Sequence, residues 1–308
     1  MSYQPTIFEQ PSSEPLAARL RPRDLDEFFG QEHLLGKGKV LRRIIENDQV
    51  GSMIFWGPPG VGKTTLARII ARRTKAKFID FSAVTSGIKE IKQVMNEAEN
   101  ARRFGEKTIL FVDEIHRFNK AQLDSLLPSV EQGILIFIGS TTENPYASMT
   151  PAIVSRCRVF EFEPLKESDI LKALSRALKD KRKGLGNYMA EADEEAMEHI
   201  ARAAAGDLRF AYNALELAVL TTPPGSDGRI RVTLRDAENS TGRRSLAFSE
   251  DQYYDMLSAF CKSLRGSDSN AALYYAMRLI EGGCDPRLIL RRTVVHAAED
   301  VGLADPNA

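Results

Sequence analysis

Cysteine is scarce in this sequence, and long apolar runs are missing. The 308 residues include only Cys157, Cys261 and Cys284, which form no C-x-x-C pair. Their wide separation argues against a zinc site or a disulfide framework and is typical of a reducing cytosol. The first residues contain no extended apolar core, so we expect no signal peptide. Runs such as MIFW and TILFVD are far too short to cross a bilayer. We therefore expect a cytoplasmic protein.

An excess of charge of either sign is also missing. Lysine plus arginine and aspartate plus glutamate both number 42, which gives zero formal net charge. No overall positive field attracts nucleic acid, so any contact with DNA must come from local basic patches. Residues 37–43 (KGKVLRR) form one such patch, and Lys89 with Lys92 forms another. Each patch is equally compatible with a solvated helix face.

What remains is an ordinary globular composition with a regular pattern in its first half. The length suggests about two or three domains. Short apolar runs predict buried parallel strands at residues 53–56, 78–81, 108–113, 135–140 and 159–162. Helical spacing of apolar residues fills the gaps, for example over 88–98 and 123–130. This alternation predicts a doubly wound α/β domain that binds its ligand at the carboxyl ends of the strands.

The pattern becomes purely helical after Pro164. Helical runs are predicted at about 166–183, 193–205 and 207–220, and the turn-rich stretch TTPPGSDGR closes this block. A third segment, from Ser245 to the end, holds three more helical runs. We therefore predict an α/β core over residues 1–163, an all-α domain over 164–240 and a further all-α domain over 245–308.

The stretch GPPGVGKT matches G-x-x-x-x-G-K-[ST] between a predicted strand and an amphipathic helix, a context that identifies a P-loop. Its glycines let backbone amides point at phosphates from the positive end of the helix dipole. We expect Lys63 to reach the β- and γ-phosphates and Thr64 to bind Mg²⁺. The predicted nucleotide-binding residues of this loop are Gly57, Pro58, Gly60, Val61, Gly62, Lys63, Thr64 and Thr65.

A second signal is TILFVDEIHRFN, in which an apolar strand ends at Asp113 and Glu114. In P-loop enzymes an aspartate here holds the magnesium and the adjacent glutamate polarises the attacking water. A solvated acidic turn is the alternative, and the upstream P-loop outweighs it. His116 has no second histidine at ligand spacing, so we do not interpret it as a metal ligand. We expect it to face the nucleotide site or a neighbouring helix.

Two further stretches carry candidate site residues. The strand in LIFIGSTTENP should lie beside the Asp113 strand, where Thr142 or Asn144 could bond the γ-phosphate or the attacking water. A polar turn before a proline is an equally good interpretation. In MTPAIVSRCRVFEF, Arg156 lies between a helical run and a strand. From the residues alone a structural, salt-bridging arginine is favoured, and Arg158 is as good a candidate as Arg156.

Several motifs, taken in order, resemble AAA+ ATPases of the clamp-loader clade: RLRPRDLDEFFGQEHLL, GPPGVGKTT, ILFVDEIHRFN, GSTTENP, SRC and GDLRFAYNALE. Other stretches are similar to the RarA (MgsA) family of bacterial replication-associated recombination ATPases, relatives of the Mgs/Werner-interacting proteins: SAVTSGIKEIKQV, DEIHRFNKAQ and SAFCKSLRGSDSNAALYYAMRLIEGGCDPRLILRR. The resemblance extends from about Pro15 to the end. It implies an AAA+ core, a helical lid and a helical collar that forms tetramers. It also implies collar helices beyond Ala308, so we expect a truncated chain and leave its own assembly open.

The resemblance assigns further roles. It implies that Arg156, in the Ser-Arg-Cys motif, is an arginine finger that reaches the γ-phosphate bound by a neighbouring subunit. An inserted guanidinium of this kind accelerates phosphoryl transfer by about 10³–10⁵. It implies that Arg209, otherwise interpreted as a solvated arginine, senses the γ-phosphate from the lid. It also implies that Arg21, Pro22 and Gln31 wrap the adenine, where a linker packed on the domain edge is the alternative. The implied cofactors are ATP and Mg²⁺.

The leading hypothesis is a DNA-dependent ATPase of replication fork maintenance, recombination and repair. It would remodel DNA ends or gaps near single-strand-binding protein, in the nucleoid. The sequence itself indicates only the ATPase; the resemblance implies the DNA role. A sliding-clamp loader subunit is disfavoured by the RarA-type stretches. A non-hydrolysing scaffold is disfavoured because Lys63, Glu114 and Arg156 are all present. A branch-migration motor is weaker still, since we recognise no winged-helix domain.

Overall fold

The computed structural model describes residues 14–82, 87–242 and 250–305. Its contacts divide the chain into two units, Met1–Thr241 and Gly242–Ala308. Residues 83–86 of the SAVTSGIKEIKQV stretch, and Ser245 at the predicted start of the third segment, lie outside the described residues. Within the described ranges, no helix combines the length and the apolar character needed to cross a membrane.

The core of the first unit is a five-stranded sheet in the order β2-β3-β4-β1-β5, with all neighbouring strands parallel. The predicted strands are confirmed, with shifts of one residue at some ends. They are β1 (Met53–Trp56), β2 (Lys77–Ser82), β3 (Thr108–Asp113), β4 (Ile136–Thr141) and β5 (Arg158–Glu161). β4 lies between β3 and β1, so the carboxyl ends of these three strands meet at one edge of the sheet.

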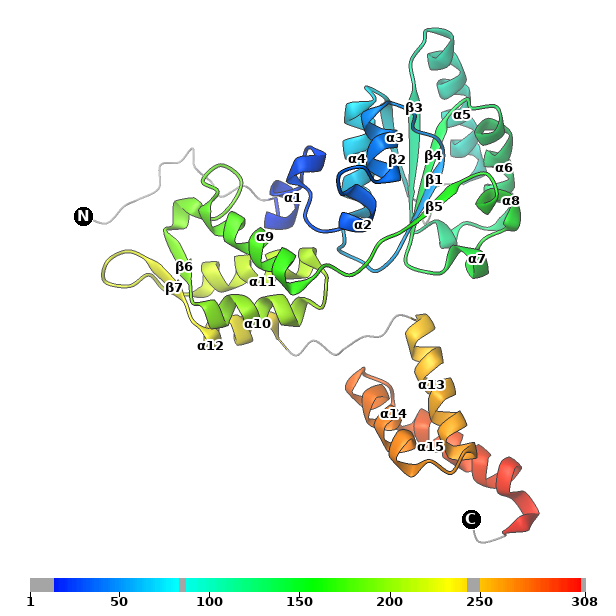
Figure 1. Ribbon diagram of the computed structural model, residues 1–308, viewed down its shortest axis with the longest axis vertical. Coiled ribbons are helices and arrows are strands. Elements are labelled where there is room, and N and C mark those ends of the chain that lie inside the picture. The colour runs from blue at the N-terminus through cyan, green and yellow to red at the C-terminus, as the bar shows by residue number, and fades with distance from the viewer. Residues whose placement is uncertain (1–13, 83–86, 243–249, 306–308) are drawn as a thin grey trace. The chain divides into compact units, whose positions relative to one another are not determined.

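Helices cover both faces of this sheet (Figure 1). On one face lie α2 (Glu32–Leu35), α3 (Val40–Glu46) and α4 (Lys63–Arg73), and on the other lie α5 (Ile88–Arg103), α6 (Lys120–Glu131) and α8 (Pro151–Val154). Successive strand residues point to opposite faces. Phe55 and Phe111 accordingly pack in the α4 cluster, whereas Ile54 and Leu110 pack in the α5 and α6 cluster. Because both faces are buried, the strands read as continuous apolar runs.

A helical region follows the sheet within the first unit. Its main helices are α9 (Glu167–Lys179), α10 (Glu194–Ala204), α11 (Leu208–Thr221) and α12 (Leu234–Thr241), which share one apolar core. The region also contains a small parallel pair, β6 (Ala190–Ala192) and β7 (Ile230–Val232), which the sequence pattern did not indicate. Three-residue strands are too short for a period of two to stand out.

The N-terminal segment joins this helical region to the sheet domain. Helix α1 (Leu16–Arg19) packs on α11, where Arg19 Nη2 lies 2.6 Å from Glu216 Oε1 and the Leu16 amide donates to Glu216 Oε2 at 3.0 Å. Further along, Gln31 is 6% exposed and bonds the Glu163 backbone with both amide atoms, donating to its carbonyl at 2.6 Å and accepting from its N–H at 3.1 Å. Gln31 thereby fastens the N-terminal segment to the link between β5 and α9.

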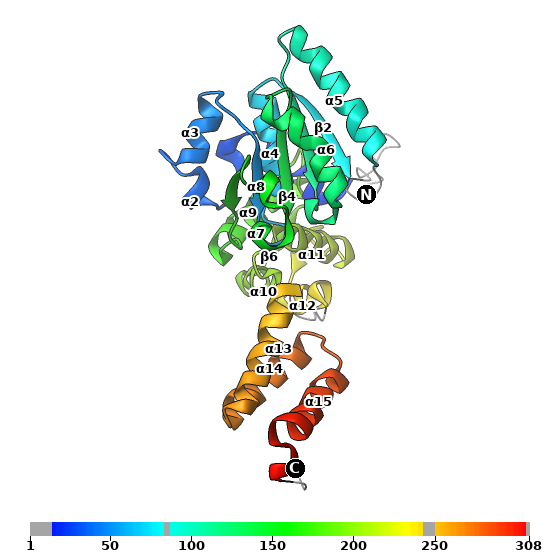
Figure 2. The same ribbon diagram turned by 90° about the vertical axis from the view of Figure 1, so that its right-hand side faces the viewer.

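The second unit confirms the three predicted helical runs (Figure 2). They are α13 (Glu250–Arg265), α14 (Ser269–Glu281) and α15 (Pro286–Val295). Leu257, Phe260, Leu279 and Ile289 form part of their small buried core. Asp268 caps α14 by accepting from the Ala271 amide at 3.0 Å, a typical start signal.

Candidate active site

The P-loop connects the end of β1 to the start of α4 and contacts both the N-terminal segment and the helical region. Gly60 has φ +72°, and a Cβ built there would lie 1.8 Å from Asp207 Oδ1 at the start of α11. Gly62 has φ +100°, and a Cβ there would lie 2.4 Å from the Phe28 ring. Any larger residue would strain the backbone and displace these neighbours. The loop therefore needs glycine both for its conformation and for its close packing.

Lys63 is held inside the loop and is only 8% exposed. Its Nζ donates to the carbonyl oxygens of Gly57 and Pro58, at 2.5 and 2.8 Å. Burial lowers the pKa of Lys63 to about 8, and the carboxylates of Glu114 and Asp113 oppose that shift. At neutral pH the side chain stays mainly protonated, a buried cation whose hydrogen-bond partners are neutral carbonyls.

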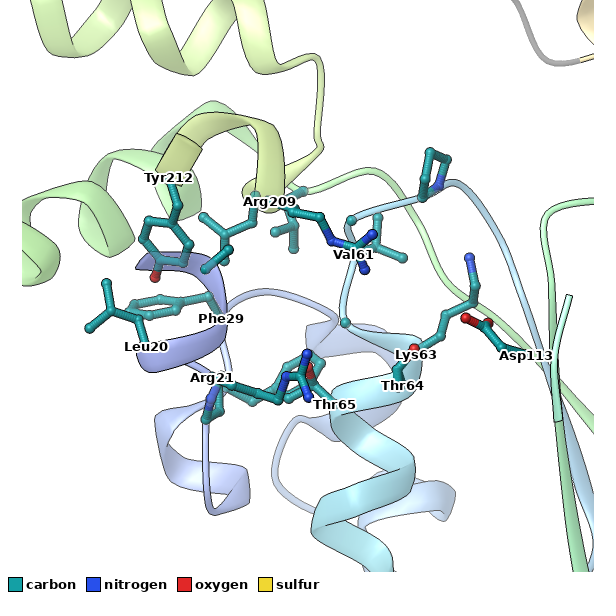
Figure 3. A pocket seen from close by; sticks show the side chains of 18 of the residues that line it. Leu20, Arg21, Phe29, Val61, Lys63, Thr64, Thr65, Asp113, Arg209 and Tyr212 are labelled. Carbon is teal, nitrogen blue, oxygen red and sulfur yellow. The ribbon is translucent and has the colours of Figure 1, made fainter. Parts of the chain in front are cut away.

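A pocket surrounds this loop and has two chemically different ends (Figure 3). Leu20, Phe29 and Tyr212 gather at one end, whereas Lys63 and Asp113 lie next to each other at the other. An apolar, aromatic surface suits a planar base, and the cation with backbone amides suits phosphates. The residues that line the pocket are Ala17, Leu20, Arg21, Pro22, Phe28, Phe29, Pro59, Gly60, Val61, Gly62, Lys63, Thr64, Thr65, Asp113, Glu114, Leu165, Leu208, Arg209 and Tyr212.

The polar end fits a nucleotide-bound Mg²⁺. Thr64 and Asp113 both line it, and the fully buried Ser140 donates a short hydrogen bond to Asp113 Oδ1, which fixes the orientation of that carboxylate. In the described part of the chain, no three His, Cys, Asp or Glu side chains gather into a protein-only metal centre. Mg²⁺ commonly takes one or two protein ligands and completes its shell with phosphates and water. A hydroxyl and one fixed carboxylate meet that requirement.

Glu114 follows Asp113 at a sharp turn, with φ +52° in the left-handed region. Strain of this kind at a non-glycine residue often marks a functional site. His116 Nε2 lies 3.2 Å from Glu114 Oε2, and His116 Nδ1 lies 3.0 Å from the Thr141 hydroxyl at the end of β4. His116 therefore lies between Glu114 and the end of β4.

Two arginines reach the pocket from outside the sheet domain. Arg209 lies in the first turn of α11, whose Leu208 amide donates to the Gly60 carbonyl at 3.3 Å. Arg21 comes from the N-terminal segment. Burial lowers the pKa of Arg21, and the cations of Arg68 and Arg209 lower it further. Cations thus accumulate beside the P-loop, an arrangement that favours a polyanion.

Other sequence-predicted residues lie elsewhere. Gln31, Thr142, Asn144 and Arg156 are not in the pocket lining, among the residues that the structure describes. Asn144 caps α7 (Pro145–Ser148), with Oδ1 accepting from the Tyr146 amide at 3.0 Å. Thr142 directly follows β4, next to the Thr141 that contacts His116.

Arg156 lies in the link between α8 and β5 and faces outward. Its Nε and Nη2 contact the Glu131 carboxylate at the end of α6, and its Nη1 donates to the Ala152 carbonyl at 2.7 Å. Arg158 begins β5, where its amide donates to Ser52 O at 3.0 Å.

The motifs in the sequence did not predict the apolar wall of the pocket or the Ser140 hydroxyl that bonds Asp113. Tyr212 follows Arg209 by three residues, a spacing that places both on one helix face. That spacing was a usable signal, as was the aromatic pair Phe28 and Phe29 beside the predicted adenine segment. Ser140 carried no comparable signal, because its partner Asp113 lies on another strand. His116 was expected to face the nucleotide site or a neighbouring helix, and it contacts Glu114 beside the pocket.

Family models match most of the chain. The model for the ATPase family associated with various cellular activities (AAA) matches residues 53–165, and the AAA C-terminal domain matches 186–265. The MgsA AAA+ ATPase C-terminal model matches residues 266–308.

The chain is also similar to named relatives. Replication-associated recombination protein A of Bacillus subtilis is 46% identical over 96% of this chain and 69% of its own length. The Escherichia coli K12 protein of that name is 45% identical over 98% and 68%. ATPase WRNIP1 of Dictyostelium discoideum is 40% identical over 98% of this chain and 36% of its own length.

Solved structures match the fold. The RuvB Holliday junction branch migration motor of Thermotoga maritima aligns with a TM-score of 0.57 and 23% identity, over 80% of this chain and 79% of that one. A RuvB mutant from the same organism aligns with a TM-score of 0.58 and 22% identity, over 88% of each chain. At this identity the likeness concerns architecture alone.

Proposed function

This chain belongs to the replication-associated recombination protein A family of AAA+ ATPases, and we propose that it hydrolyses ATP to remodel DNA at ends or gaps of replication forks. One observation carries the catalytic part of the proposal. Lys63, Thr64 and Asp113 lie at one end of a pocket whose other end is apolar and aromatic, and Glu114, the residue after Asp113, also lines this pocket. That arrangement suits a nucleoside triphosphate.

Each residue has a role in this mechanism. Lys63 would exchange its carbonyl partners for the β- and γ-phosphates. Thr64 and Asp113 would hold Mg²⁺, which neutralises phosphate charge when bound. Glu114 would polarise the attacking water, and Thr142 or Asn144 would sense the γ-phosphate from the end of β4.

Other residues would sense the γ-phosphate or hold the rest of the nucleotide. Arg209 would bond the γ-phosphate from the helical region, so that its position follows nucleotide occupancy. Arg21 and Pro22 would contact the base and sugar side of the nucleotide, with Gln31 holding their segment in place. The remaining P-loop residues, Gly57, Pro58, Val61 and Thr65, would supply backbone and hydroxyl contacts.

Arg156 completes the mechanism from a second subunit. Its outward position supports a finger that enters the pocket of a neighbour. The core would extend to about residue 163 and the lid over 164–240, and residues 245–308 would belong to a collar for a homotetramer. We further propose a cytoplasmic, nucleoid-associated protein that works near single-strand-binding protein.

The test measures phosphate release with duplex ends, gapped DNA, single strands and no DNA. Lys63→Ala should lose ATP binding, because Lys63 is the one cation in the P-loop sequence GPPGVGKT. Glu114→Gln should bind ATP normally and stop turnover, because the amide cannot accept a proton. Near-normal turnover by Glu114→Gln would overturn the catalytic assignment.

Equal rates with all DNAs would overturn DNA dependence, and a response to a sliding clamp would favour a clamp loader. ATP binding without phosphate release by the unaltered chain would favour a scaffold.

A further inference from the structure

His116 occupies a position that no part of the mechanism above uses. Its side chain is 11% exposed and lies between the turn after β3 and the end of β4. Nε2 faces two carboxylates, Glu114 Oε2 at 3.2 Å and Glu143 Oε1 at 3.6 Å. Nδ1 faces the hydroxyl of Thr141 at 3.0 Å. Each ring nitrogen therefore has a defined partner.

The partners at Nε2 determine where one ring hydrogen lies. Both groups at Nε2 are carboxylate oxygens, which only accept, so Nε2 carries a hydrogen. Thr141 Oγ1 accepts from the Glu143 amide at 3.0 Å and also lies 3.3 Å from the Glu143 carbonyl oxygen, to which it donates, so it can meet His116 Nδ1 either as donor or as acceptor. His116 thus links the Thr141 hydroxyl, which is hydrogen-bonded to Nδ1, to the Glu114 carboxylate, which lies within ion-pair distance of Nε2.

Thr141 is itself a rigid anchor. It is fully buried, it pairs with Trp56 in the sheet, and its carbonyl accepts from the amide of Gly57, the first P-loop residue, at 3.1 Å. Glu114, by contrast, lies on a strained turn with a half-exposed side chain. A long side chain on such a turn has several rotamers of similar energy, and one polar contact such as that with His116 Nε2 favours one of them.

We propose that His116 is a positioning residue that orients the Glu114 carboxylate and couples it to the end of β4. The inference rests on the proposed ATPase function. Holding Glu114 Oε2 leaves Oε1 to face the attacking water. The same contact transmits any shift of β4, the strand that precedes Thr142, to the carboxylate that acts as the base of the reaction. A displacement of about 1 Å in such a group can cost about a hundredfold in rate.

Two substitutions of His116 test the contact made by Nε2 and the contact made by Nδ1 separately. The glutamine amide reaches about as far as Nε2 and the asparagine amide about as far as Nδ1, and each can donate. His116→Gln therefore keeps the donor to Glu114, whereas His116→Asn keeps only the Thr141 side. We expect His116→Gln to retain kcat within about threefold. We expect His116→Asn to lose about 10- to 100-fold in kcat, with the KM for ATP within about twofold.

His199 supplies a matched control, because its Nε2 contacts the Thr241 hydroxyl at 3.1 Å away from the pocket. His199→Asn should change the melting temperature about as much as His116→Asn and leave kcat unaltered. If His116→Asn fails to fold, Thr141→Ser and Thr141→Val make the same comparison from the other partner: serine keeps the hydroxyl and valine removes it. Valine should then lower kcat more than serine.

The outcomes are distinguishable. Equal kcat for His116→Gln and His116→Asn, or equal kcat for the two Thr141 variants, would overturn the inference while Glu114→Gln remains inactive. Turnover by Glu114→Gln would instead show that the proposed role of Glu114 is wrong. A loss confined to KM would make His116 a binding residue and would also overturn the positioning role.

Discussion

Lys63 and Arg156 carry the same charge in opposite surroundings. Lys63 is 8% exposed and bonds only neutral carbonyls, whereas the Arg156 side chain is 37% exposed and pairs with the Glu131 carboxylate. A buried cation without a carboxylate bonded to it is prepared for an anion that comes from outside the chain. An exposed cation that already has a carboxylate must exchange partners before it can act elsewhere.

The burial of Lys63 and the pairing of Arg156 also differ in their energetic consequences. Burial lowers the pKa of Lys63 to about 8, so the folded chain tolerates a poorly solvated charge that a polyphosphate would stabilise. The Arg156–Glu131 pair lies on the surface, where ion pairs contribute about 0–1 kcal/mol. Breaking that pair therefore costs little. The difference is consistent with the proposal that one chain builds the pocket and that Arg156 acts on a neighbouring chain.

The largest expected effect tests that difference directly. Arg156→Ala should bind ATP nearly normally, because its own pocket is intact, and should lose about 10³-fold or more in hydrolysis rate in the assembled protein. Mixing Arg156→Ala with Lys63→Ala subunits should restore part of the activity, since some interfaces then join an intact pocket to an intact arginine. Phosphate release by the single and mixed preparations measures both effects.

Arg158→Ala is the matched control, since Arg158 is also exposed and lies two residues after Arg156, at the start of β5. It should leave turnover nearly unchanged. A purely structural Arg156 would give a lower melting temperature, no selective loss of turnover and no rescue. Absence of rescue in a demonstrably mixed oligomer would contradict action in trans.

The sequence predicted most of the pocket because its signals are local. The P-loop is one contiguous motif, and Asp113 and Glu114 directly end an apolar strand. The strands were recognisable because helices bury both faces of the sheet, which makes residues such as Ile54 and Phe55 apolar alike. Sequence position alone was therefore enough to predict that the P-loop residues, Asp113 and Glu114 lie in the pocket.

The remaining features depend on pairs that are far apart in sequence. Gln31 bonds Glu163, and Arg156 bonds Glu131. Both are contacts between polar side chains and distant elements, which no periodicity encodes. Gln31 was expected at the adenine, and its amide instead forms a backbone link. Only the folded structure reveals which partner Gln31 or Arg156 bonds, because several equally polar groups in the sequence could have served.

The second effect is smaller and concerns the partner of the finger. Glu131→Gln should raise the hydrolysis rate about two- to fivefold at limiting protein concentration, because the neutral amide holds Arg156 less firmly and a surface pair contributes up to about 1 kcal/mol. Glu99→Gln, which weakens the exposed Arg103–Glu99 pair on α5, should have no such effect. Titration of activity against protein concentration makes the comparison. A lower rate for Glu131→Gln would show instead that Glu131 orients the finger.

The smallest effect concerns DNA on another outward surface. Lys89 and Lys92 are exposed and three residues apart on α5, so they share one helix face. In the competing patch Arg42 is already committed to Asp26 and Glu46, at 2.8 and 2.7 Å, which reduces the positive field there. We therefore expect the α5 lysines to contact phosphates.

Replacing both lysines with alanine should weaken binding to every DNA sequence and reduce the slope of log K against log salt by about one for each lysine that binds a phosphate. The measurement is the affinity for one duplex end at several salt concentrations, with Lys37→Ala/Lys39→Ala as the matched control. An unchanged slope for the α5 variant, together with a reduced slope for the control, would move the DNA-binding surface to residues 37–43. Either result identifies exposed lysines that, unlike the buried Lys63, act outside the nucleotide pocket. The pocket is complete without DNA, so these substitutions should leave the ATP affinity measured in its absence unchanged.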